Sequence, residues 1–148
     1  MDIKKTANSF ANFTIKRIAE IFGLTVFCAG ALLLLALITY SPEDPNFIFP
    51  ENTKIDNILG FQGSFVSDIF FQSIGLVSYF FSFTLIITGI NIIRSKEFFL
   101  IIENIFFAII YCIFGTLFFA HFYSEAFTLY INGNGGFIGA YLNKIFLN

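Results

Sequence analysis

Tryptophan is absent from this chain, methionine occurs once, and only 12% of the 148 residues are charged. Ordinary globular domains contain about 25% charged residues and about 45–50% apolar ones. Here 57% of the residues are hydrophobic and 24 are phenylalanine. A soluble domain of this size would leave apolar patches in water that are large enough to cause aggregation. The composition argues against a soluble enzyme, a disordered tail and a disulfide-stapled secreted domain, and it favours a protein embedded in a lipid bilayer.

Cysteine and net positive charge are also scarce. Cys28 and Cys112 lie within long apolar runs, are too few for a disulfide framework, and have no histidine partners at metal-ligand spacing. We therefore predict that both are small buried apolar residues and that the chain binds no metal or other cofactor. The net charge of −2 provides no basic field that would attract nucleic acid, so we expect no direct contact with nucleic acid.

Catalytic motifs are missing as well. The sequence has no G-x-x-x-x-G-K-[ST] phosphate loop, no H-E-x-x-H zinc motif, no G-x-S-x-G nucleophile motif and no paired-carboxylate constellation. Glu103 and His121 lie near opposite ends of the third apolar run, and each is expected at a membrane interface rather than in a proton or ion pathway. The sequence predicts no enzymatic activity.

Three apolar runs are long enough to cross a membrane. A helix needs about 20 apolar residues to span a hydrocarbon core of about 30 Å. Residues 21–40, 69–93 and 98–122 meet that length and predict an all-α integral membrane protein with three transmembrane helices. The remaining parts are expected to be an N-terminal segment (residues 1–20), a long loop (41–68), a short link (94–97) and a C-terminal segment (123–148).

The C-terminal segment contains a shorter apolar pattern. Residues 137–147 follow a glycine-rich breaker and carry apolar side chains at helical spacing. Eleven residues span only about 17 Å as a helix, which is too short to cross the bilayer. The pattern predicts a short amphipathic helix that lies on the membrane surface or re-enters the bilayer.

Basic residues flank the apolar runs on one side only. The long loop carries five acidic residues against one lysine. The basic flanks are Lys4, Lys5, Lys16 and Arg17 before the first run, and Arg94 and Lys96 in the short link. By the positive-inside rule we predict a multi-pass protein of the bacterial inner membrane, with a cytoplasmic N-terminus and a periplasmic long loop. The first run lacks a small-residue cleavage site and is expected to be an uncleaved anchor.

Helix-breaking residues bound the long loop. The three prolines of the chain follow Tyr40 within ten residues, and proline cannot continue a helix, so the first helix is expected to stop near Tyr40. Gly60 and Gly63 predict a turn before the second span. Asp68 is expected to cap the head of that span.

Small residues recur at helical spacing in the second and third runs, where they would allow helices to pack closely in lipid. The second run carries Gly75, Ser78, Ser82 and Gly89, and the third carries Asn104, Ala108, Cys112 and Gly115. With only a short link between the runs, the pattern predicts a tightly packed antiparallel hairpin. The small residues could pack within one chain or between subunits, and the remaining phenylalanine- and isoleucine-rich faces are expected to contact lipid.

The loop and glycine motifs resemble a known membrane domain. Tyr40-Ser-Pro-Glu-Asp-Pro-Asn-Phe47 follows the first run, Asn57-x-Leu-Gly-x-x-Gly comes next, and Asp68-x-x-Phe-x-x-x-Gly-x-x-x-Tyr79 continues it. A Gly-Gly-x-x-Gly-x-x-Leu segment begins at Gly135. In order and spacing these resemble the amino-terminal four-span membrane domain of FtsK/SpoIIIE-type DNA translocases. The motif residues are Tyr40, Ser41, Pro42, Asp44, Pro45, Asn57, Gly60, Gly63, Asp68, Gly135, Gly136 and Gly139.

The sequence departs from that family in three respects. Ser82 stands where the family often has a proline, three residues after the motif tyrosine. The chain stops at Asn148, before the expected fourth span, and the motor with its Walker motifs is absent. We therefore expect either a fragment of a longer translocase or a short homologue that acts alone.

The resemblance implies a membrane-anchoring and assembly role at the division septum, in cell division and chromosome segregation, without ATPase or DNA-binding parts. The implied partners are the lipid bilayer, further copies of the chain and membrane proteins of the division complex. The alternative is a small multi-pass transporter or pore subunit. Such a protein would need polar residues along a path at mid-bilayer, whereas Gln72, Asn91 and Asn104 lie toward the ends of the runs.

Overall fold

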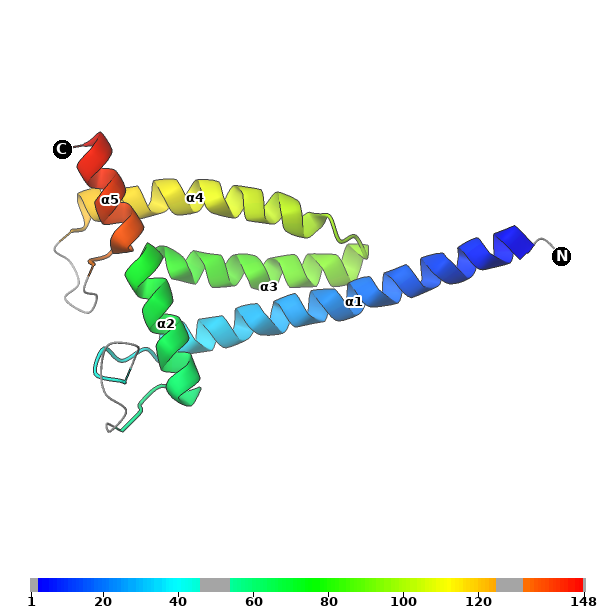
Figure 1. The fold of residues 1–148 in the computed structure, drawn as a ribbon, viewed down its shortest axis with the longest axis horizontal. Coiled ribbons are helices and arrows are strands. Elements are labelled where there is room, and N and C mark those ends of the chain that lie inside the picture. The colour runs from blue at the N-terminus through cyan, green and yellow to red at the C-terminus, as the bar shows by residue number, and fades with distance from the viewer. Residues whose placement is uncertain (1–2, 46–53, 125–131, 148) are drawn as a thin grey trace.

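The computed structural model describes residues 3–45, 54–124 and 132–147, and within these ranges it is built from helices without strands (Figure 1). In chain order the helices are α1 (Ile3–Ile38), α2 (Gly60–Ile74), α3 (Val77–Ser95), α4 (Leu100–Phe122) and α5 (Gly136–Phe146). The long helices α1, α3 and α4 lie alongside one another, and the short helices α2 and α5 cross them near one end (Figure 1). The predicted all-α fold is confirmed.

Three helices of the described part are long and apolar enough to cross a membrane, as the sequence predicts. Their candidate spans are Asn8–Ile38, Val77–Ser95 and Leu100–Phe122. At 1.5 Å per residue the 36 residues of α1 extend about 54 Å, well beyond a hydrocarbon core of about 30 Å. Its N-terminal part therefore projects past the end of α3 (Figure 1). The predicted N-terminal segment (residues 1–20) is not a separate element, because from Ile3 onward it continues as the helix of the first span.

The predicted second span (residues 69–93) is wrong, because two helices share these residues. The first of them, α2, ends at Ile74, and the second, α3, begins at Val77. Between them Gly75 has a φ of 59°, a left-handed conformation that interrupts a helix and that glycine adopts without a Cβ clash. The chain turns sharply there, so that α2 lies across the ends of α1 and α3 (Figure 1). The helix of this region that is long and apolar enough to cross a membrane is α3.

The structure confirms some of the other predicted helix boundaries and corrects others. As predicted, α1 stops before the prolines, at Ile38. The helix α2 begins at Gly60, which has a φ of 67°. Residues 60–68, which were expected in the long loop, are therefore helical. Gly63 lies inside this helix and not in a turn. Asp68 is buried in the interior of α2 and does not cap a span. The helix α4 matches the predicted third span to within two residues at its start.

The helices α1 and α3 pack with their backbones in direct contact. A Cβ added to Gly89 of α3 would lie 2.5 Å from the amide nitrogen of Phe27, and one added to Gly23 of α1 would lie 2.9 Å from the carbonyl oxygen of Gly89. About two helical turns further along α1, a Cβ at Gly30 would lie 2.8 Å from the amide nitrogen of Ile86. Such spacing leaves no room for a side chain, and the two backbones touch directly.

The contact between α3 and α4 is made by side chains instead. The Asn104 amide donates to the Thr88 hydroxyl at 2.9 Å, and the hydroxyls of Thr84 and Tyr111 are 2.8 Å apart. A Cβ at Gly115 would meet only the Val77 side chain, at 3.0 Å. The predicted hairpin of the second and third runs is therefore not the tightest pair. Gly89, assigned to that hairpin, packs on α1.

Replacing Gly89 with leucine is expected to separate α1 from α3 and to lower the stability of the helix bundle by more than the about 1–3 kcal/mol usual for overpacking, because backbone atoms must move. Thermal unfolding in detergent micelles, followed by circular dichroism, measures the loss. The matched control is Ile90→Leu, next to it on the exposed side of α3. Equal melting temperatures for the two variants would contradict the backbone contact.

The core lies where α1, α2 and α3 meet. Leu33, Leu37 and Phe71 form its buried centre. The rings of Tyr40 and Tyr79 flank Phe71, with ring centroids 4.9 and 5.5 Å away. The two cysteines lie elsewhere and are free. Cys28 is exposed on α1 and Cys112 half-buried on α4, so the prediction that both are buried is wrong.

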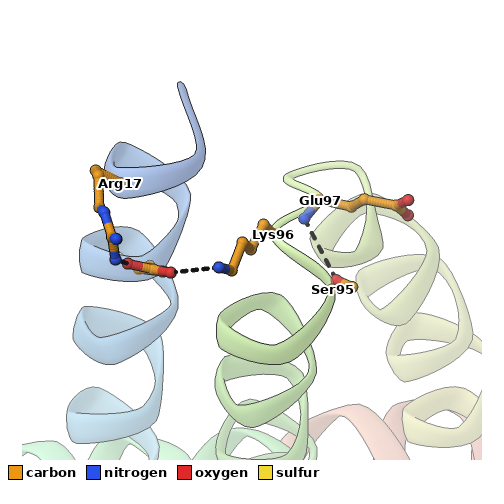
Figure 2. A network of polar contacts seen from close by, with 5 residues as sticks. Arg17, Ser95, Lys96 and Glu97 are labelled. Carbon is orange, nitrogen blue, oxygen red and sulfur yellow. Dashed lines mark hydrogen bonds and ion pairs between the residues drawn. The ribbon is translucent and has the colours of Figure 1, made fainter. Parts of the chain in front are cut away.

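Charged residues hold the opposite end of the bundle together. Lys96, directly after α3, points toward α1, and its ammonium lies 2.8 Å from the Glu20 carboxylate (Figure 2). Arg17 binds the other oxygen of the same carboxylate. Lys96 adopts a φ of 62°, which ends α3 and turns the chain toward α4. We call this part, with Arg94, the basic end.

Candidate functional site

Most residues of the loop motif gather at the end of the bundle opposite the basic end, where α1 stops and α2 begins (Figure 1). Side chains from the loop, α1 and α2 form hydrogen bonds there over sequence separations of 12 to 28 residues. We call this set the loop-end network. It consists of Tyr40, Asp44, Asn57, Ser64 and Asp68.

Asp44 fastens the two sides of the loop to each other. Its side chain is 2% exposed, and its carboxylate accepts hydrogen bonds from the backbone amides of Asp56, at 2.8 Å, and Asn57, at 2.9 Å. Hydrogen bonds to an ionised acceptor are about twice as strong as neutral ones. The Asp44 amide in turn donates to the Ser41 carbonyl at 3.2 Å, which shapes the proline-containing turn.

Asn57 caps the end of α1 from a distance. The last carbonyls of a helix have no partner within it. The Asn57 side-chain amide donates to two of them, Ala36 at 2.9 Å and Thr39 at 3.2 Å, and its oxygen accepts from the Leu59 amide at 3.1 Å. A Cβ on Gly63 would lie 2.2 Å from that oxygen, so the family glycine makes room for the cap.

Tyr40 and Asp68 connect α1 to α2. The Tyr40 hydroxyl donates to the Asp68 carboxylate at 3.1 Å, while the Ser64 hydroxyl donates to the buried Pro45 carbonyl at 3.1 Å. On α3 the Tyr79 hydroxyl donates to the Leu37 carbonyl of α1 at 3.2 Å, which also accepts from the Tyr40 amide. The loop end is thereby tied to all three neighbouring helices. The other motif residues are arranged around it, with Ser41 half-buried, Pro42 exposed and Gly60 at the start of α2.

The glycine segment at the start of α5 forms a second close contact. Cβ atoms added to Gly135 and Gly139 would lie 2.4 and 2.3 Å from the Thr116 carbonyl oxygen of α4. One added to Gly136 would lie 2.6 Å from the Ser73 carbonyl oxygen of α2. The three motif glycines therefore let α5 rest against the backbones of α2 and α4.

Asn134 joins the same contact to the break between α2 and α3. Its carbonyl accepts from the Leu76 amide at 2.9 Å, which satisfies a donor that the interrupted helix leaves free. Its side-chain amide donates to the Tyr123 carbonyl. Beside it, Asn132 donates to the Gln72 side chain at 2.9 Å. Gly75 thus marks a junction rather than a packing position along a span.

The remaining predicted packing residues are spread over several surfaces. Ser78 and Ser82 are buried on α3 and donate to carbonyls one turn earlier, at 2.6 and 2.8 Å. Ala108 is buried on α4, whereas Cys112 and Gly115 are half-buried. They do not form one continuous seam.

Sequence reasoning missed several residues that hold the fold together. Gly23 and Gly30 were not selected, although their seven-residue spacing repeats the pattern that singled out Ser82 and Gly89. Nothing in the local pattern marks Asn134 or Thr116, because their roles depend on segments that are distant along the chain. The interfacial residue His121 lies 3.1 Å from the Asn143 side chain of α5.

The chemistry of this region is structural. Within residues 3–45, 54–124 and 132–147, no group of three or more histidine, cysteine or acidic side chains is placed to hold a metal ion. The Asp44 and Asp68 carboxylates accept hydrogen bonds from the protein itself. The arrangement holds the loop and the short helices against the long helices.

The chain matches one family profile, the 4TM region of DNA translocase FtsK/SpoIIIE, over residues 15–148. Among curated proteins, it is 29% identical to the DNA translocase FtsK of Rhizobium meliloti over 66% of the chain and 11% of that protein. It is 36% identical to the DNA translocase FtsK of Caulobacter vibrioides over 53% of the chain and 10% of that protein. It is 32% identical to that of Brucella melitensis over 47% of the chain and 8% of that protein.

The matches define how far the similarity extends. The chain spans about a tenth of the length of the curated relatives it matches. The matching profile describes the membrane region of the translocases and not their motor. No solved structure matches the chain. With the family profile covering all but the first 14 residues, the chain belongs to the family of 4TM regions of DNA translocases of the FtsK/SpoIIIE type.

Proposed function

We propose that this chain anchors and assembles a DNA translocase in the bacterial inner membrane and thereby serves cell division and chromosome segregation. The observation that carries the proposal is the family match over residues 15–148. Three helices of membrane-spanning length and composition lie largely within it, and the residues of the loop-end network other than Ser64 belong to the motifs that resemble that family. Neither feature supplies an ATPase or DNA-binding site, so the proposed role is positional.

We further propose that the basic end faces the cytoplasm and the loop end faces the periplasm. The support is that Arg17, Arg94 and Lys96 gather at one end of the bundle, which is the charge pattern of cytoplasmic flanks. In this orientation the exposed residues around the buried loop-end network, such as Pro42 and Ile58, are available to membrane proteins of the division complex. The buried residues of α4 are Ala108 and Thr116. The exposed surface of this helix is available to lipid and to further copies of the chain.

The transporter or pore alternative has less support. A pore needs polar side chains that line a path through the bilayer. Between α3 and α4 the polar side chains bind each other instead, Asn104 to Thr88 and Thr84 to Tyr111. These pairs hold the helices together in lipid.

Localisation and exchange in cells test the proposed function. A fluorescent fusion of this chain in Caulobacter vibrioides is expected to concentrate at the constriction site. Exchanging the chain for the matching membrane region of that organism's translocase is expected to preserve the septal position of the translocase, because both belong to the same family of membrane regions. Fluorescence microscopy of dividing cells measures both.

The control is a fusion that carries Glu43→Ala, a change at an exposed loop residue beside the network. It is expected to localise as the unmodified chain does. An unrelated three-span protein gives the uniform membrane signal for comparison. A uniform signal from the unmodified chain, at equal expression, would rule out the septal role.

A further inference from the structure

The polarity of α2 is inverted relative to a helix on the surface of a soluble protein. Its polar residues Ser64, Ser67 and Asp68 are buried, whereas the uncharged Gln62 is exposed. Its outer face carries exposed apolar side chains, Phe61 at 42% and Ile69 at 46% exposure. Asp68 is the one charged residue in the helix, and it points inward to Tyr40. An outer face without charge and with exposed rings suits lipid rather than water.

The same arrangement recurs in α5. Its glycine side rests on α4 and α2, while Phe137 and Tyr141 are 61% and 58% exposed on the other side. Their rings stack with centroids 6.2 Å apart. Lys144, near the end of the helix, is exposed and provides a polar edge. An aromatic face beside a lysine is typical of a helix in the membrane interface.

Both short helices occupy one layer at the loop end. Figure 1 shows α2 and α5 crossing the long helices at a steep angle, so they lie along the membrane surface when the long helices cross the membrane. The two touch where Gly136 of α5 lies against the Ser73 carbonyl of α2. Between α1 and α2 the structure has an apolar groove of about 400 Å³, lined by residues that include Leu32, Ala36 and Val66. Leu32 of this lining is 51% exposed, so the groove opens toward the apolar outer surface of α1.

We propose that α2 and α5 form an interfacial layer embedded in one leaflet, with the exposed faces at Phe61, Ile69, Phe137 and Tyr141 in contact with lipid. Interfacial helices are buried about 5–10 Å into the boundary between headgroups and acyl chains. The chain then displaces more lipid in the leaflet at the loop end, which receives five helices, than in the leaflet at the basic end, which receives three. This proposal stands independently of the division role.

Single tryptophans test the depth of these faces, since the chain has none of its own. The variants Phe61→Trp and Phe137→Trp keep an aromatic ring at exposed positions, and Ile69→Trp and Tyr141→Trp give a second probe on each helix. The control is Phe114→Trp, on the exposed face of α4 near the middle of that span. Each protein is reconstituted in phosphatidylcholine vesicles with bromine near the headgroup end or near the methyl end of the acyl chains.

The four probes on α2 and α5 are expected to lose more emission with shallow bromine than with deep bromine, and the Phe114→Trp control to show the reverse. Quenching of the four by aqueous iodide and not by either brominated lipid would place these faces in water. Resistance to both quenchers would place them under protein, and a deeper position than the control would place them in the hydrocarbon core. Each of these three outcomes overturns the proposal.

Discussion

Replacing Asp44 with alanine is expected to lower the free energy of unfolding by about 1–3 kcal/mol, the cost of a buried donor without an acceptor, because the buried amide of Asn57 loses its acceptor while the amide of the exposed Asp56 can bind water instead. The loss reaches further than the two bonds. Asn57 is held in place by Asp44, and it is Asn57 that caps the last carbonyls of α1. The variant is expected to melt at a clearly lower temperature in detergent micelles, measured by circular dichroism.

Two further variants make this result specific. Glu43→Ala removes a carboxylate next to Asp44 at an exposed position and is expected to change stability by about 0.5 kcal/mol or less. Asp44→Asn keeps the shape of the side chain but loses the ionic acceptor, so an intermediate loss is expected. If Asp44→Ala melted together with Glu43→Ala, the loop-end network would have no role in stability.

The second large effect is expected for Gly75→Ala. At a φ of 59° the added Cβ would lie 1.9 Å from the Asn134 carbonyl oxygen. The left-handed conformation and the clash together are expected to lower the free energy of unfolding by about 3 kcal/mol or more. Because Asn134 is part of the segment that leads into α5, relief of the clash displaces this segment from the junction of α2 and α3. Thermal unfolding measures the loss.

Gly60→Ala separates the two causes of that effect. Gly60 has a similar φ, 67°, but open space within 4 Å of the added Cβ. Its substitution is expected to cost only the about 1–2 kcal/mol of a left-handed alanine. The excess of Gly75→Ala over Gly60→Ala is then the contribution of close packing against Asn134. Equal losses in the two variants would show that backbone conformation alone explains both.

The membrane character and the long helices of this protein could be predicted from local sequence, because length and hydropathy suffice to identify a span. The break at Gly75 could not. Within an apolar run a glycine fits both a packing position and a helix end, and only the contact with Asn134, about sixty residues away, selects the latter. The predicted cap at Asp68 is wrong because local sequence does not show which helix contains this residue. Its position in the interior of α2 depends on where that helix begins.

Local sequence also could not show which helix packs against each face of small residues. Periodicity shows that Gly89 lies on a face suited to close packing, but it does not say whether α1 or α4 covers that face. The loop motif marked Asp44 and Asn57 as important through family resemblance. Their physical tasks, holding the two sides of the loop together and capping α1, became visible only once residues 12 to 21 positions apart were placed side by side.

The cap on α1 has a consequence for the order of events during synthesis. The carbonyls of Ala36 and Thr39 receive their partner from Asn57, which leaves the ribosome about twenty residues later. Until then these carbonyls at the end of the first span must accept hydrogen bonds from water. The helix acquires this cap only after Asn57 has been made, and the seat of α5 requires α2 and α4 to be in place. We therefore expect the domain to assemble from its first span toward its last helix during synthesis.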